Sequence, residues 1–369
     1  MPDLSAPFPY WGGKSRIAAV IWEGLGADVP NYIETCGGSL AALLQRPGGA
    51  GKIETVNDAS YFVMNFWRAI KRDPWKVAEW CEDPVAEADL HARHEWLMTN
   101  EDFVERMHRD PYHCDFQVAA WWCWGICCWV GSGWCDEGIR KQQLPHLAVT
   151  SDGAATGRGI LSKAAVARNT LPQQAPHLSS DMGVFRKQRM PSLGNDRGIH
   201  GVSTTPGTYL HALKTLTVPE APECFGWFFE LACRLRHVRL AHGDWTRVVT
   251  PSILGKGRNV GGRRPCGVFI DKPYLPSMRT RKLYAKDEPH ISQQVFEWAL
   301  EHGDDPDLRI AVCGYEGEHD FPSSWRKHAW VGARGYASED NDNRKKERVW
   351  FSPHCLKPAR SLLDLLGTP

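Results

Sequence analysis

Residues 31–44 read NYIETCGGSLAALL, and this stretch decides the fold class. Residues 31–34 predict a short strand, residues 35–39 a tight turn, and residues 40–44 the start of a helix. A strand that passes through a glycine turn into a helix brings backbone close to a ligand, and the helix start offers the ligand free N–H groups. The stretch therefore predicts an α/β fold with a binding turn.

A second strand is predicted over residues 53–56, and it ends at Asn57 and Asp58. Asp58 follows Gly38 by 20 residues. At this spacing in α/β folds, a carboxylate accepts hydrogen bonds from the ribose hydroxyls of an adenosine-type ligand. Strand-end aspartates are common by themselves. Combined with the glycine turn, this one favours a nucleoside cofactor.

The remaining elements continue the alternation of strands and helices. Further strands are predicted at 236–242, 267–270, 309–313 and 348–351, a helix at 290–302, and an aromatic, mostly helical segment at 76–135. The charged residues 344–346 suggest that the last strand lies at the edge of the sheet. We expect most tryptophans of the helical segment to pack in a core rather than to stack on bases.

The stretch GVFIDKPY, residues 267–274, joins an apolar strand to polar residues at its carboxyl end. Open α/β sheets place their chemistry at this end of the strands. One interpretation is a plain strand ended by proline. The functional interpretation makes Asp271 the acceptor of a hydrogen bond from an amino group and Tyr274 a stacking platform for a planar base.

The 369 residues have a formal net charge of +1, with 42% hydrophobic and 24% charged residues. This composition is typical of globular proteins, and no apolar stretch is long enough to span a membrane. We therefore expect a cytoplasmic protein. Residues 138–215 contain ten basic and three acidic residues, so this segment carries +7 and the rest of the chain −6. The segment is either a solvated basic surface or a region that faces phosphates.

Twelve cysteines occur, none of them in the CxxC spacing of zinc ribbons and redox motifs. We expect buried free thiols and no metal site. A zinc site built from some of Cys123, Cys127, Cys128, Cys135 and His113 is the alternative, although the adjacent Cys127 and Cys128 point to different faces of a helix.

Five motifs resemble those of the Dam-like adenine-N6 DNA methyltransferases, especially phage-type members. In chain order they are FPYWGGK at residues 8–14, YIETCGGS at 32–39, Asn57-Asp58, Gly243-Asp244-Trp245, and DKPY at 271–274. The family has Asp-Pro-Pro-Tyr in the last place. The resemblance implies an α/β, Rossmann-like class I methyltransferase sheet with a reversed last strand. It also implies a largely helical target-recognition insert at 76–221, between the parts 1–75 and 222–369 of the catalytic domain.

The resemblance also implies roles for single residues. The cofactor S-adenosylmethionine would be held by Tyr10, Trp11, Lys14, Glu34, Cys36, Gly37, Asp58 and Asp244. The catalytic residues would be Asp271, Lys272, Pro273 and Tyr274, of which Asp271 and the Lys272 carbonyl accept the N6 amino group of a flipped adenine. The partner would be double-stranded DNA, with Arg186, Lys187, Arg189, Arg263 and Arg264 as candidate phosphate contacts.

Lys272 departs from the family, because it adds a cation where the cofactor already carries a sulfonium. Two like charges ~5 Å apart at an effective dielectric constant of ~20 repel by roughly 3 kcal/mol. Either a nearby acid or solvent compensates Lys272, or the donor is carboxy-S-adenosylmethionine and the product is N6-carboxymethyladenine, or the protein is a catalytically inactive DNA-binding protein. Transfer to N4 of cytosine or to RNA follows the same chemical logic and also stays open.

Overall fold

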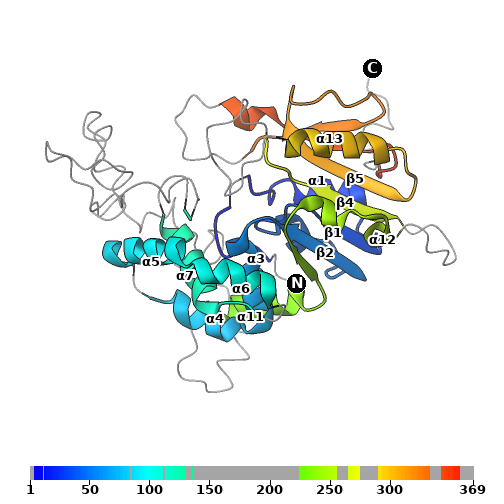
Figure 1. Cartoon of the computed structure of the whole chain (residues 1–369). Coiled ribbons are helices and arrows are strands. Elements are labelled where there is room, and N and C mark those ends of the chain that lie inside the picture. The colour runs from blue at the N-terminus through cyan, green and yellow to red at the C-terminus, as the bar shows by residue number, and fades with distance from the viewer. Residues whose placement is uncertain are drawn as a thin grey trace, which may run out of the picture. The chain divides into compact units, whose positions relative to one another are not determined.

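The computed structural model describes residues 4–10, 12–83, 85–110, 113–129, 134–135, 224–255, 265–274, 290–332 and 342–357. The chain divides into two compact units, and Figure 1 labels many of their helices and strands. The sheet unit comprises residues 12–58, 237–280 and 288–369, and the helical unit comprises residues 1–11, 59–236 and 281–287.

The described part of the sheet unit contains one seven-stranded sheet, in the order β3-β2-β1-β4-β5-β7-β6. The strands are β1 (Asn31–Glu34), β2 (Ile53–Asp58), β3 (Arg239–His242), β4 (Cys266–Ile270), β5 (Leu308–Tyr315), β6 (Arg326–Ala329) and β7 (Glu347–Phe351). The first five in the sheet order are parallel, and β7 is antiparallel to both β5 and β6. The predictions of an α/β class and of a mostly parallel sheet with a reversed last strand are confirmed.

The prediction that the last strand lies at the edge of the sheet is wrong. β7 has β5 on one side and β6 on the other, so β6 is the edge strand. The sequence RKHA of β6 has no alternation of apolar and polar residues. Short, charged edge strands are common because they resist pairing with other chains, and the same property hides them from pattern analysis.

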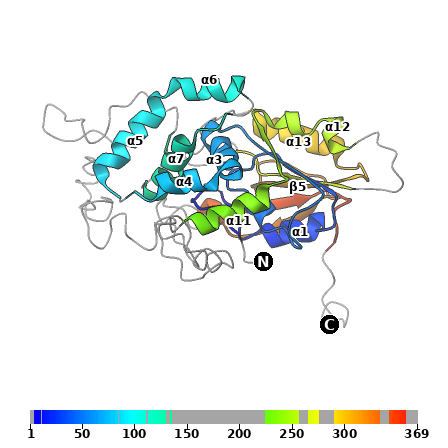
Figure 2. The ribbon, with the colours of Figure 1, turned by 90° about the horizontal axis from the view of Figure 1, so that it is seen from below.

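Helices cover both faces of this sheet. α1 (Ala18–Leu25) lies on one face, while α12 (Pro251–Leu254) and α13 (Ile291–His302) lie on the other (Figure 2). The α13 side forms a core that includes Val268, Ile310 and Val295. The sheet unit also contains α2 (Ala41–Leu44) and the short 3-10 helices η1 (Trp245–Val248) and η3 (Asp342–Lys346).

The helical unit contains α3 (Tyr61–Arg72), α4 (Pro74–Cys81), α5 (Glu87–Thr99), α6 (Glu101–Arg109), α7 (Phe116–Cys128) and α11 (Phe225–Leu235). Its core is aromatic: Phe8 lies 5.1 Å from Phe66 and 4.9 Å from Trp122, measured between ring centroids. Trp122 and Trp124 are buried, so the prediction of core packing is confirmed for both. The helices α3 and α11 belong to this unit, whereas the sequence assigned residues 59–75 and 222–236 to the catalytic domain.

The described residues show neither a membrane-spanning helix nor a metal site. None of their helices combines the length and the apolar character that crossing a bilayer requires. No three His, Cys, Asp or Glu side chains among them are grouped to hold a metal ion. All twelve cysteines are free, and burial raises the pKa of the Cys123, Cys128 and Cys135 thiols well above the usual value.

His94 makes the helical unit sensitive to acid. The ring is 5% exposed and stacks on Trp129 at 5.2 Å, and burial lowers its pKa from 6.5 to about 4. Because the unfolded chain takes up a proton first, the free energy of unfolding should fall as the pH drops from 6.5 towards 4, by up to about 3 kcal/mol. Denaturant titrations at both pH values measure this loss. The variant His94→Phe keeps the stacking and should lose this part of the pH dependence; an unchanged dependence would show that another group causes it.

Candidate functional site

The candidate site lies at the carboxyl ends of β1, β2 and β4. The sheet order reverses direction between β1 and β4, which are neighbours in the sheet although far apart in the sequence. In open parallel sheets such a switch point creates the crevice where ligands bind. Glu34 ends β1, Asp58 ends β2, and Asp271 directly follows β4. The fold thus brings three of the predicted residues together at the carboxyl ends of neighbouring strands.

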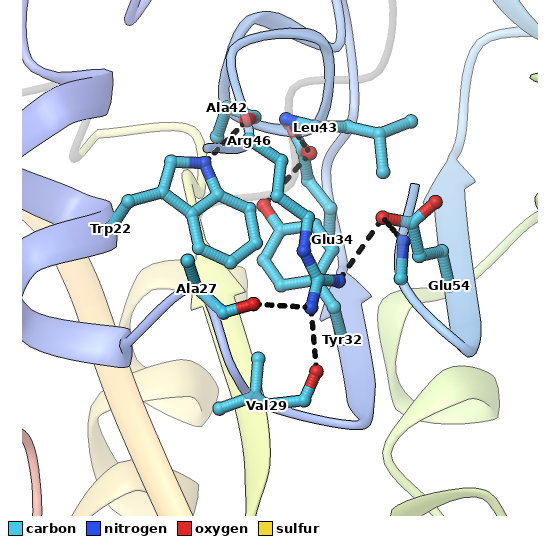
Figure 3. Close-up of polar contacts among 10 residues, drawn as sticks. Trp22, Ala27, Val29, Tyr32, Glu34, Ala42, Leu43, Arg46 and Glu54 are labelled. Carbon is cyan, nitrogen blue, oxygen red and sulfur yellow. Dashed lines mark hydrogen bonds and ion pairs between the residues drawn. The ribbon is translucent and has the colours of Figure 1, made fainter. Parts of the chain in front are cut away.

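Glu34 braces the glycine turn. Its Oε2 accepts hydrogen bonds from the Tyr32 hydroxyl at 3.0 Å and from the Leu43 backbone N–H at 3.2 Å (Figure 3). The second bond ties the end of β1 to α2, which begins after the turn. Glu34 is only 2% exposed, so within this structure its carboxylate acts as an internal brace.

Gly37 makes the turn close-packed. The Gly37 N–H donates to the Asn57 carbonyl at 2.7 Å, and a Cβ at this position would lie 2.7 Å from Cδ2 of Leu40. Leu40 itself has a φ of 53°, a left-handed conformation that non-glycine residues seldom adopt. Only glycine therefore fits position 37 without a shift of its neighbours, and the strained turn is of the kind found at functional sites.

Asn57 and Asp58 connect the turn to the loop that follows β3. Oδ2 of Asp58 accepts a hydrogen bond from the Gly38 N–H at 2.8 Å. The Asn57 side-chain amide donates to the Thr35 carbonyl at 3.0 Å and to the Gly243 carbonyl at 2.9 Å. The Asp58 carboxylate thus lies against the glycine turn, and its role toward ribose hydroxyls stays a prediction.

Asp244 lies in the same group of loops, because the preceding Gly243 N–H donates to the Asp58 carbonyl at 3.0 Å. Its side chain is exposed and accepts a hydrogen bond from the Thr246 N–H at 2.9 Å, which caps η1. Cys36 is half-buried, and burial raises the pKa of its thiol far above the usual value. The thiol is therefore neutral at physiological pH and unsuited to nucleophilic attack.

Asp271 pairs with Lys14. The Lys14 ammonium lies 2.8 Å from Oδ1 of Asp271, donates to the Gly12 carbonyl at 2.6 Å and sits 5.4 Å from the ring centre of Tyr274. Lys14 is 2% exposed, whereas the Asp271 side chain is 20% exposed. Burial raises the pKa of Asp271, and the charge of Lys14 opposes that rise. Two motifs from opposite ends of the chain thus meet as one ion pair.

Lys272 pairs with Glu318 in the interior. Its ammonium lies 2.6 Å from Oε1 of Glu318, and both side chains are 1% exposed. Burial lowers the pKa of Lys272 and the charge of Glu318 opposes this, while the Lys272 charge helps to hold the pKa of Glu318 below its usual value. Of the explanations considered for Lys272, the nearby acid is the one present in this structure.

Tyr274 is buried rather than exposed. Its hydroxyl donates to Oε2 of Glu347 at 2.7 Å, and its ring lies 4.4 Å from that of Tyr315. The side chain is 4% exposed, so its role as a stacking platform stays a prediction. Pro273 between Lys272 and Tyr274 is half-buried.

The remaining predicted residues belong to the helical unit or lie outside the described residues. Tyr10 belongs to the helical unit, where its ring lies 6.2 Å from that of Phe8. Trp11 lies outside the described residues, as do the candidate phosphate contacts Arg186, Lys187, Arg189, Arg263 and Arg264.

Sequence reasoning missed Glu318, Glu347 and a buried cluster around Arg46. The Arg46 guanidinium lies 3.1 Å from Oε1 of Glu54, donates to the carbonyls of Ala27 and Val29 at 2.9 and 2.6 Å, and sits 4.9 Å from the Trp22 ring (Figure 3). Ala27 and Val29 precede β1, and Glu54 is the second residue of β2, so the cluster lies at the end of the strands opposite to the candidate site. The one signal for the cluster was Glu54, a charged residue inside the predicted strand 53–56.

Comparison with known protein families and with curated proteins finds no match to the chain.

Proposed function

We propose that the protein transfers a methyl group from S-adenosylmethionine to the N6 amino group of adenine in double-stranded DNA. One observation carries this proposal. Asp271 follows β4 and forms an ion pair with Lys14. It lies at the same carboxyl ends of the parallel strands as the glycine turn and Asp58. The order of motifs along the chain, which resembles that of Dam-like methyltransferases, supports the same chemistry.

The glycine turn suits the proposed cofactor. A side chain at position 37 would collide with Leu40, so the backbone is bare there. Asp58 holds the turn by accepting a hydrogen bond from the Gly38 N–H. Backbone without side chains lets a ligand approach closely, and carboxylates at the ends of β2 and β3 suit ribose hydroxyls and an adenine amino group. We assign these roles to Asp58 and Asp244. When bound, the cofactor supplies a methyl group activated by a sulfonium.

The acceptor chemistry needs two hydrogen-bond acceptors near one amino group. An exocyclic amine is a weak nucleophile, because its lone pair is delocalised into the base. The carboxylate of Asp271 and the carbonyl of Lys272 accept its two N–H groups, which directs the lone pair outward, and orientation and electrostatics lower the barrier. Burial raises the pKa of Asp271, and the charge of Lys14 opposes that rise and so favours the charged, accepting form of the carboxyl group.

The Lys272–Glu318 pair favours methyl over carboxymethyl as the transferred group. Carboxymethyl transfer was considered because an unpaired Lys272 would attract a carboxylate on the donor. Glu318 already supplies that carboxylate at 2.6 Å, and the pair is buried. A second anion beside Glu318 would be repelled by it. Inactive DNA binding has no structural observation in its favour, since the Asp271 carboxylate is retained.

Nucleosides from the DNA of cells that produce the protein test this function. We expect deoxyadenosine to gain the mass of one methyl group, at the N6 position, when the DNA is digested and analysed by mass spectrometry. A carboxymethyl adduct would refute the argument from Glu318. Unmodified deoxyadenosine with modified cytosine would refute the adenine target, and wholly unmodified DNA would favour the inactive alternative.

A further inference from the structure

The Glu318 carboxylate makes further hydrogen bonds besides its ion pair with Lys272. Besides the Lys272 ammonium, its Oε1 accepts a hydrogen bond from the Ser292 hydroxyl at 2.6 Å. Its Oε2 accepts from the Tyr315 N–H at 3.0 Å, and its own N–H donates to the Tyr315 carbonyl at 3.1 Å. The turn that these bonds close contains Gly317 at a φ of 81°. The carboxylate is thereby fixed to β5 and to α13.

Lys272 takes its direction from this fixed carboxylate. Its ammonium reaches Glu318 from the segment between β4 and Tyr274, and both side chains are 1% exposed. A buried lysine cannot leave such a partner without a large electrostatic cost, because no water replaces it. The backbone at Lys272 is therefore tied, through its own side chain, to the turn after β5.

The tether matters because Lys272 stands where the resembling family has proline. Proline fixes its own φ, whereas lysine does not. Pro273 restricts the backbone of Lys272 to extended conformations but leaves its φ a wide range. Under the proposed function, the carbonyl of Lys272 has to point at the amino group, so some other feature must hold it.

We propose that Glu318 is a positioning residue, which anchors the Lys272 side chain and so holds the Lys272 carbonyl in its accepting orientation. The inference rests on the proposed function. It assigns to a glutamate 46 residues away in the chain the restraint that the fixed φ of a proline would supply at position 272. The acceptor itself remains the Lys272 carbonyl, and Glu318 acts only through Lys272.

The test compares Glu318→Gln with the matched variant Glu316→Gln in the full-length chain. Glu316 lies in the same turn but pairs on the surface with Lys327 and Arg348. We expect Glu318→Gln to lower kcat by about 10- to 100-fold, with a change in KM of less than about threefold, because the acceptor is misaligned but binding is retained. Glu316→Gln should keep both constants.

Rescue by proline distinguishes positioning from general damage. The double variant Lys272→Pro with Glu318→Gln should have a kcat at least about 3- to 10-fold above that of Glu318→Gln, which is half of the loss on a logarithmic scale. The reason is that proline fixes the backbone without a tether. Wild-type kcat in Glu318→Gln, or no recovery in the double variant, would overturn the proposal. If Glu318→Gln does not fold, Lys272→Met with Glu318→Gln removes both charges; low kcat in this folded variant supports the tether, and wild-type kcat overturns it.

Amide hydrogen exchange separates this inference from the proposed function. We expect peptides that cover residues 271–274 to exchange faster in Glu318→Gln than in wild type or Glu316→Gln. If the wild type transfers no group to DNA, the proposed function fails, and faster exchange still establishes the anchoring of Lys272. Equal exchange in all three proteins would overturn the anchoring itself, whatever the activity.

Discussion

Replacement of Asp271 by alanine should abolish transfer almost completely, with kcat reduced by about 10²- to 10³-fold or more. The carboxylate is the only charged acceptor that we assign to the amino group, and its removal also leaves Lys14 without its 2.8 Å partner. Single-turnover rates with DNA and labelled cofactor measure this loss. Because burial raises the pKa of Asp271, we also expect the wild-type rate to fall as the pH drops into the acidic range and the carboxylate becomes protonated.

Asp304→Ala provides the control for this prediction. Asp304 is exposed in the sheet unit. Its hydrogen bond with His354 involves the backbone carbonyl, which the alanine variant keeps. This variant should retain the wild-type rate. Melting temperatures of both variants show whether a loss of rate reflects unfolding. A folded Asp271→Ala variant with more than about a tenth of the wild-type rate would contradict the role given to the carboxylate.

Replacement of Arg46 by alanine should give the largest loss of stability, about 3–5 kcal/mol in the free energy of unfolding. The Arg46 and Glu54 side chains are 4% and 3% exposed, and the variant would leave the Glu54 carboxylate and the carbonyls of Ala27 and Val29 without this donor (Figure 3). The bonds to Glu54 and Val29 are buried, and a buried acceptor that loses its donor is costly because water does not replace the donor. Denaturant titrations monitored by circular dichroism measure the change.

Two further variants identify the cause of that loss. Lys52→Ala removes an exposed charge close to Glu54 in the chain and should change stability by less than about 0.5 kcal/mol. Arg46→Lys keeps the charge but cannot donate to three acceptors from a planar group, so most of the loss should remain. If Arg46→Lys matched the wild type, charge alone rather than the hydrogen bonds would account for the cluster.

The strands and turns of the sheet could be predicted because their signals are local. β1, β2 and β4 are apolar runs that end at glycine, Asn-Asp and Asp-Lys-Pro, and each signal lies within a few residues. Two aspects of the sheet depend on tertiary pairing instead. The polar strand β6 gave no signal, and the charges before β7 suggested an edge position that pairing with both β5 and β6 contradicts.

The candidate site divides in the same way. Gly37, Asp58 and Asp271 stand at strand ends that hydrophobic patterns locate. The partners of Lys272 and Tyr274, which are Glu318 and Glu347, lie 46 and 73 residues away in the chain, and no local pattern connects residues so far apart. The sequence showed that the charge of Lys272 needs compensation. The partner that compensates it, Glu318, is identified by the fold. Similarly, the buried position of Tyr274 follows from Tyr315 and Glu347 rather than from its own motif.

The division into units also depends on packing more than on composition. The apolar faces of α3 and α11 are compatible with either unit, and the sequence assigned both helices to the catalytic domain. In the structure they belong to the same compact unit as α4 and α7. A hydrophobic helix face indicates that a partner exists, but it does not say which element that partner is.

The most direct test of the account is the transfer of a labelled group to DNA by the purified protein. The wild type and Asp271→Ala are incubated with DNA and S-adenosylmethionine whose methyl group carries three deuterium atoms, and the nucleosides are then analysed by mass spectrometry. We predict that the trideuterated methyl group appears on N6 of deoxyadenosine with the wild type and is absent with Asp271→Ala. Label on another nucleoside, or none on DNA with a folded wild-type protein, would contradict adenine-N6 methyl transfer.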